Sequence, residues 1–130
     1  MVHLMTKVAE YAIILNSKNE FLMVQFGEFH NFKWHFPGGR LEENEESVQG
    51  LIREIKEETN VEVADIKPFF TKVFHPEDPK YGVFFLAKVI EPYKVKITDE
   101  HNDFKWFKKS DLDKIDFWQP FYKKMLEDNL

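Results

Sequence analysis

Apolar and polar residues form blocks that predict strands in the first third of the chain. Residues 8–15 and 20–26 are two apolar, β-prone runs, and the turn-forming residues 16–19 between them predict a hairpin. A short strand is expected around residues 34–36, and the Pro-Gly-Gly sequence at 37–39 is expected to end it. The first 40 residues therefore predict three strands and no helix.

The period of the pattern changes to a helical one from about Glu45 to Glu58. Asn44 is expected to cap the start of this helix, and Asn60 can take the left-handed conformation that ends it. Apolar residues recur at i, i+3, i+4 and i+7, which predicts a single core-facing stripe formed by Val48, Leu51, Ile52 and Ile55.

Beyond this helix the sequence predicts more strands than helices. Strands are expected over 66–75, 82–90 and 104–107, a helical turn over 110–115, and a second helix over 119–127. Because the helices lie between or after groups of strands and do not alternate with them, the pattern predicts an α+β protein and not a doubly wound fold. The length, 130 residues, predicts a single domain over residues 1–130.

Composition narrows the class of protein. The chain has no cysteine, which excludes a disulfide framework and a thiolate zinc site and makes a reducing cytoplasmic compartment the expected one. The formal net charge of -5 argues against binding of nucleic acid along its phosphate backbone. The apolar runs are far shorter than the roughly 20 residues that a membrane-spanning helix needs, so we expect no membrane partner.

The negative charge is concentrated in one segment. Residues 42–62 contain eight glutamates against Arg53 and Lys56, a net charge of -6, so the remainder of the chain carries +1. Three of these glutamates are spaced i, i+3 and i+4 and share one helix face: Glu54, Glu57 and Glu58. Like charges within one turn destabilise a bare helix by about a few tenths of a kcal/mol per pair.

Two interpretations of these three glutamates are open. Taken alone, they are typical of a solvated helix face. They also provide the hard oxygen ligands that suit Mg²⁺, or alternatively Mn²⁺, together with substrate phosphate. The only two arginines of the chain, Arg40 and Arg53, lie in or beside this segment, and the planar guanidinium of Arg53 can hold Glu45 or a metal-binding glutamate bidentately.

Residues 39–61 resemble the Nudix box, G-x5-E-x7-R-E-U-x-E-E-x-G-U, in which U is a bulky aliphatic residue. Asn60 replaces the final glycine and is the one departure. The residues at 36–39 and 100–107 also resemble the family, so the resemblance to the Nudix hydrolases (MutT-like) covers essentially the whole chain. It implies the Nudix fold, an α/β/α sandwich around a mixed sheet. Eight positions match: Gly39, Glu45, Arg53, Glu54, Ile55, Glu57, Glu58 and Val61.

The resemblance implies a role for each matching residue. Arg53 would orient a carboxylate of the box, Glu45 or Glu54. One more acid from the loop before the Trp106 strand would act as a metal ligand or general base, and we assign this role to Glu100 with Asp103 in reserve. The metal ligands would be Glu54, Glu57, Glu58 and the backbone carbonyl of Gly39. The residues assigned to catalysis are Arg53, Glu54, Glu57 and Glu100.

The implied reaction is hydrolysis of the pyrophosphate bond in a nucleoside diphosphate linked to another moiety. That moiety is open: the substrate could be a nucleotide sugar such as ADP-ribose, a dinucleoside polyphosphate or a nucleoside triphosphate. We assign Arg40, Phe74 and Tyr81 to substrate binding, with Tyr81 near a tyrosine of dinucleoside polyphosphate hydrolases. The five histidines show no metal-ligand spacing. The alternative is a catalytically silent Nudix module that binds nucleotides or regulates, and a homodimer is compatible with either.

Overall fold

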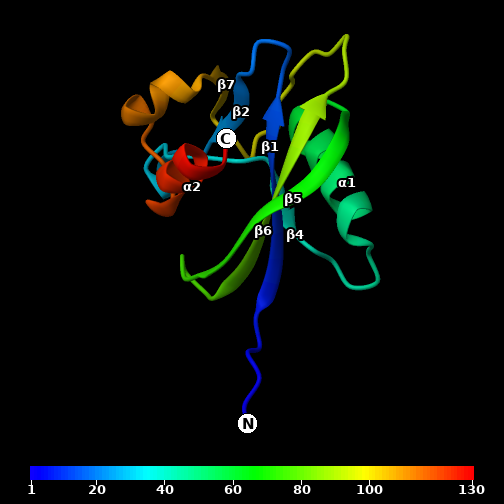
Figure 1. The fold of residues 1–130 in the computed structure, drawn as a ribbon, viewed down its shortest axis with the longest axis vertical. Coiled ribbons are helices and arrows are strands. Elements are labelled where there is room, and N and C mark those ends of the chain that lie inside the picture. Colours follow the sequence, from blue (N-terminus) through cyan, green and yellow to red (C-terminus); the bar gives the residue numbers. More distant parts are fainter.

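The computed structural model describes residues 1–130 as a seven-stranded mixed sheet with one helix on each face (Figure 1). The central strand, β1 (Lys7–Leu15), pairs antiparallel with β2 (Phe21–Gln25) and parallel with β6 (Lys80–Val89). The long strand β5 (Val63–Phe74) lies antiparallel to β6 at the edge. The parallel pair makes the sheet mixed, as the resemblance implied.

Three short strands complete the sheet around β1 and β2. β3 (Trp34–His35) and β7 (Asp103–Phe107) both pair antiparallel with β2, whereas β4 (Gly38–Arg40) pairs antiparallel with β1. Two short 3₁₀ helices lie in connections: Glu28–His30 between β2 and β3, and Lys109–Lys114 between β7 and the C-terminal helix. The short strands matter because β3 and β4 carry the residues that lead into the main helix.

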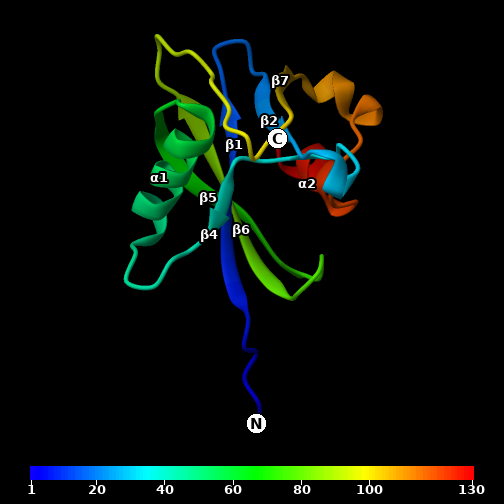
Figure 2. The same ribbon diagram turned by 180° about the vertical axis from the view of Figure 1, so that it is seen from behind.

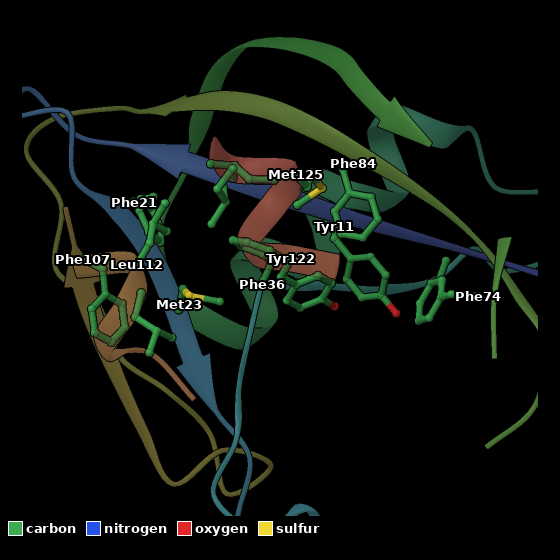
Figure 3. Close-up of a cluster of buried hydrophobic side chains, with 14 residues drawn as sticks. Tyr11, Phe21, Met23, Phe36, Phe74, Phe84, Phe107, Leu112, Tyr122 and Met125 are labelled. Carbon is green, nitrogen blue, oxygen red and sulfur yellow. The ribbon is translucent and has the colours of Figure 1, made fainter. Parts of the chain in front are cut away.

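The two helices cover opposite faces of the sheet, which Figure 2 shows from behind. α1 (Ser47–Thr59) packs against one hydrophobic cluster, and α2 (Phe121–Asn129) packs against a larger one that is rich in aromatic rings (Figure 3). Along β1 the side chains alternate between the two: Tyr11 and Ile13 belong to the α2 side and Ala12 to the α1 side. The predicted α+β class and α/β/α arrangement are confirmed. Neither helix is long and apolar enough to cross a membrane.

Most predicted elements are confirmed, with shifted boundaries. The hairpin, the strands and both helices are present, and Asn60 ends α1 in the left-handed conformation with φ of 66°. The predicted helix cap is wrong: Asn44 lies outside α1 at φ of 65°, and Glu46 occupies the capping position without a side-chain capping bond. The predicted core stripe is too wide, because Val48 and Ile52 are 40% and 37% exposed.

The strand around residues 34–36 ends before Pro37, as predicted, but the glycines that follow begin a further strand that was not predicted. Gly38 and Gly39 begin β4, and Gly38 pairs with Tyr11 in the centre of the sheet. Gly38 has φ of +144°, and a side chain there would run into the carbonyl oxygen of Glu10 and lie 2.8 Å from Tyr11 Cα. The absence of a Cβ therefore lets β4 approach β1 closely.

We predict that Gly38→Ala destabilises the protein by at least about 2 kcal/mol, because the new methyl group meets backbone atoms that cannot move independently of β1. Chemical denaturation followed by circular dichroism measures this change. Gly27→Ala is the matched control, since a Cβ at Gly27 meets no atom within 4 Å. Equal stability of the two variants would show that β4 does not depend on this close approach.

Candidate active site

Two glutamates of α1 lie against the glycines of β4. Glu58 Oε2 accepts a hydrogen bond of 2.8 Å from the Gly38 N–H. The Glu54 carboxylate lies so near Gly39 that a Cβ on this glycine would be 3.1 Å from it. Helix geometry places the two carboxylates on one face, and the β4 backbone supplies the surface that this face meets. The glycine strand and the acidic helix therefore form one wall.

Arg53 connects the other glutamates of this segment. Its Nε and Nη2 atoms contact the two Glu45 oxygens at 2.7 and 3.1 Å, which is a bidentate pair. Its Nη1 atom lies 3.2 and 3.1 Å from the two Glu57 oxygens, and Nη2 is 3.3 Å from Glu54 Oε1. Gly50 leaves room for Glu45, because a Cβ there would lie 2.6 Å from Glu45 Cδ. The structure thus contains the Arg53–Glu45 contact that the sequence suggested.

These contacts divide the carboxylates into two electrostatic groups. The hydrogen bonds from Arg53 lower the pKa of Glu45. Burial raises the pKa of Glu54, against the opposing effect of Arg53. Burial also raises the pKa of Glu58 to about 8, and the nearby charges of Glu54 and Glu100 add to this effect. Glu58 is therefore a buried carboxyl group that has no lysine or arginine beside it.

Glu100 reaches this helix from the loop between β6 and β7. Ligand atoms of Glu58, Glu100 and His101 lie within 4.8 Å of one another. Within this group, His101 Nε2 is 4.0 Å from Glu58 Oε1 and 3.0 Å from the Nε2 atom of His35. Asp103, the reserve acid, lies on β7, where its carboxylate accepts a bond from the Phe104 N–H, and it belongs neither to this group nor to the lining of the adjoining cavity. The geometry therefore favours Glu100 over Asp103.

The acidic group opens into a cavity of about 360 Å³. Arg40 and Lys80 bring positive charge to its lining, and burial lowers the pKa of Lys80. The side chains of Phe26 and Trp118 form an aromatic wall, with ring centroids 5.3 Å apart in an edge-on arrangement. The Nζ atom of Lys80 lies over the Trp118 ring, 5.9 Å from its centroid. The lining thus combines acids, cations and aromatic rings.

Of the three residues predicted to bind substrate, one lines the cavity and two do not. Arg40 lines the cavity. Phe74 is buried in the core, where its ring packs edge-on against Trp118, and Tyr81 is exposed and does not line the cavity. The roles of Phe74 and Tyr81 remain predictions, but neither residue has a contact with this cavity.

Several lining residues were not assigned to the site from the sequence. Phe26 and Trp118 come from segments far apart in the sequence, so no motif joins them. Lys80 could not be distinguished from the other lysines by its sequence, because the chain has 16 of them. His35 and His101 lack a metal-ligand spacing, and only the fold brings their rings together.

The donor set fits a divalent cation. Glu54, Glu58 and Glu100 provide carboxylate oxygens, which hard cations prefer. Glu58 and Glu100 have no lysine or arginine partner among the ion pairs of the structure, and burial, together with the neighbouring carboxylates, raises the pKa of Glu58. Glu57 stands on the same helix face but is exposed and turned toward Arg53. A cation placed between α1 and the Glu100 loop would relieve the repulsion.

Comparison with known proteins identifies the class. The NUDIX domain family model matches residues 5–128, so the chain belongs to the NUDIX family. It is 31% identical over 106 residues to a bis(5'-nucleosyl)-tetraphosphatase (asymmetrical) of Caenorhabditis elegans, covering 78% of this chain and 76% of that protein.

Two further comparisons extend this result. A crystal structure of a C. elegans Ap4A hydrolase binary complex superposes with a TM-score of 0.76 at 28% identity, covering 92% of this chain and 93% of that one. The 8-oxo-dGDP phosphatase NUDT18 of Danio rerio is 32% identical over 93 residues, which are 71% of this chain. The match spans only 28% of the length of that zebrafish protein.

We predict that the metal-free protein becomes less stable as the pH rises from 7 to 8.5. The unfolded chain has Glu58 ionised above its ordinary pKa of 4.5, whereas the folded protein keeps it protonated up to about pH 8. Folding therefore takes up a proton, which costs more free energy as the pH rises and stops changing once Glu58 is ionised in the folded protein too. Thermal unfolding in a chelator measures the effect.

Glu58→Gln is the matched variant for this pH experiment, because it keeps the shape and removes the ionisation. Its melting temperature should change less between pH 7 and 8.5 than that of the wild type. Excess Mg²⁺ or Mn²⁺ should reduce the wild-type loss, since a bound cation favours the ionised carboxylate. An identical pH slope in the wild type and the variant would show that Glu58 is not the responsible group.

Proposed function

We propose that this protein hydrolyses, with Mg²⁺ or Mn²⁺, the pyrophosphate bond of a nucleoside diphosphate linked to another moiety. The observation that carries the proposal is the pair of carboxylates, Glu58 and Glu100, that face one cavity without forming an ion pair with a lysine or arginine. Arg40 and Lys80 line the same cavity. A site with this distribution attracts a metal ion at one part of its lining and phosphate oxygens at another. The Nudix box around Arg53 supports the same assignment.

The residues divide the work as follows. Glu54, Glu58 and the Gly39 carbonyl would hold the cation, which supplies Lewis-acid charge to the phosphate oxygens when bound. Glu57, which contacts Arg53 in the structure, would turn its carboxylate toward the cation to complete the ligand set, while Arg53 keeps Glu45 and Glu54 oriented.

Glu100 would take the proton of the attacking water at one of its carboxylate oxygens. It suits this role because its side chain is exposed to the cavity and has no hydrogen-bond partner in the protein that would have to be broken. Arg40 and Lys80 would bind the phosphate oxygens that lie farther from the cation.

A dinucleoside polyphosphate is the substrate class that we favour. A chain of several phosphates carries more negative charge than one cation neutralises, and Arg40 and Lys80 provide the additional positive charge. The aromatic wall of Phe26 and Trp118 offers a stacking surface for a base. The similarity to the C. elegans tetraphosphatase over most of both chains supports the same class.

A hydrolysis panel tests the proposed function. It contains diadenosine tetraphosphate, ADP-ribose, a nucleotide sugar, unmodified and oxidised nucleoside triphosphates, and a 5'-triphosphorylated RNA, each with Mg²⁺ or Mn²⁺. We expect the highest kcat/KM with diadenosine tetraphosphate, and the identity of the products shows which phosphorus is attacked. Nucleotide binding without turnover of any substrate would instead support the silent-module alternative.

We predict that Glu57→Gln lowers kcat at least about a hundredfold at saturating metal ion, because the variant keeps the side-chain shape while removing a ligand charge and a partner of Arg53. Glu43→Gln is the matched control, since Glu43 belongs to the same acidic segment but is exposed and makes no side-chain hydrogen bond or ion pair in the structure. Near-normal turnover by the Glu57 variant would contradict the assignment of this residue.

A further inference from the structure

Two buried histidines meet beside the acidic cluster. His35 lies on β3 and His101 directly follows Glu100; their exposed fractions are only 5% and 8%. Their Nε2 atoms are 3.0 Å apart. The His35 ring is also stacked on Phe26, with centroids 3.9 Å apart and planes 5° from parallel. His35 is therefore fixed on one side by an aromatic ring and on the other by His101.

The chemistry of this contact is defined by the two nitrogens. At 3.0 Å, one imidazole must donate an N–H and the other must accept it, which requires that the pair share a single hydrogen. Neither Nδ1 atom has a hydrogen-bond partner in the protein. The Nε2 contact is thus the one short polar bond that sets the orientation of the His101 ring.

Glu100 itself makes few contacts that would fix its position. Its side chain makes no hydrogen bond or ion pair, and its backbone N–H reaches Thr98 Oγ1 only at 3.4 Å. The two residues that follow it are anchored firmly. Asn102 donates to Gln25 twice, from its backbone N–H at 2.8 Å and from Nδ2 at 2.7 Å, and His101 contacts His35. The loop is therefore tied to β2 and β3 just beyond Glu100.

We propose that His35 is a positioning residue that acts through His101 to fix the loop bearing Glu100 beside Glu58. The same contact explains why we do not assign His101 to the cation, because the nitrogen nearest Glu58 is the one engaged by His35. In its catalytic consequence the inference rests on the proposed function, but the effect on the loop is independent of any reaction.

The test is a His35→Phe variant, which keeps a ring against Phe26 and removes the bond to His101. Hydrogen–deuterium exchange should become faster at the amides of His101 and Asn102, while the amides of β1 stay protected. Steady-state kinetics with the best substrate of the panel should show kcat lowered about tenfold or more with little change in KM, the range usual for residues that orient a catalytic group.

A double-mutant cycle separates positioning from general damage. If His35 acts through Glu100, His35→Phe should change kcat by less than about twofold in a Glu100→Gln background. An equal loss in both backgrounds, or unchanged exchange of the loop amides, overturns the inference.

A reciprocal variant covers the case in which His35→Phe does not fold. His101→Phe breaks the same contact from the loop side and should give the same faster exchange at Asn102 and the same dependence on Glu100. Unchanged exchange at Asn102 in this variant also overturns the inference. Absence of all hydrolysis by the wild type would refute the proposed function, yet the exchange measurement would still decide whether His35 holds the loop.

Discussion

The contacts of Arg53 organise the acidic segment on which the site depends. This guanidinium has five N–H donors in one plane, and it uses them on Glu45, Glu54 and Glu57. Those contacts compensate part of the repulsion within α1, so the helix forms despite its concentrated charge. They do not reach Glu58, which is buried against β4 with a raised pKa. Arg53 thus supplies one positive charge to this segment, and the proposed metal ion would supply a second beside Glu58.

Three glycines leave the space in which β4, α1 and the glutamates pack together. Gly38 lets β4 lie against β1, Gly39 leaves space for the Glu54 carboxylate, and Gly50 leaves space for Glu45. In each case a backbone segment or carboxylate occupies the volume where a side chain would begin. Gly39 and Gly50 therefore contribute to the site by leaving room for carboxylates, and Gly38 contributes by letting the strand that carries Gly39 lie close to β1.

Structural features that depend only on residues close together in the sequence could be predicted from it. The left-handed end of α1 at Asn60 and the shared face of the box glutamates follow from local geometry. The exposure of Val48 and Ile52 does not, because it depends on how far the sheet extends beneath the helix. The parallel pairing of β1 with β6 and the meeting of His35 with His101 join segments more than 60 residues apart. Spacing within a motif carries no information about such contacts.

The distribution of charge explains how an acidic protein can suit a phosphorylated substrate. The segment 42–62 carries a net -6 and the rest of the chain +1. The fold brings Lys80, from the first residue of β6, and Arg40, from the last residue of β4, to the lining that also contains Glu58 and Glu100. Net charge measures none of this, because it sums over groups that the sheet holds apart or together. The proposed polyphosphate substrate would bind where both signs face one cavity, and it is the pairing of the strands, which composition does not reveal, that brings the two signs together.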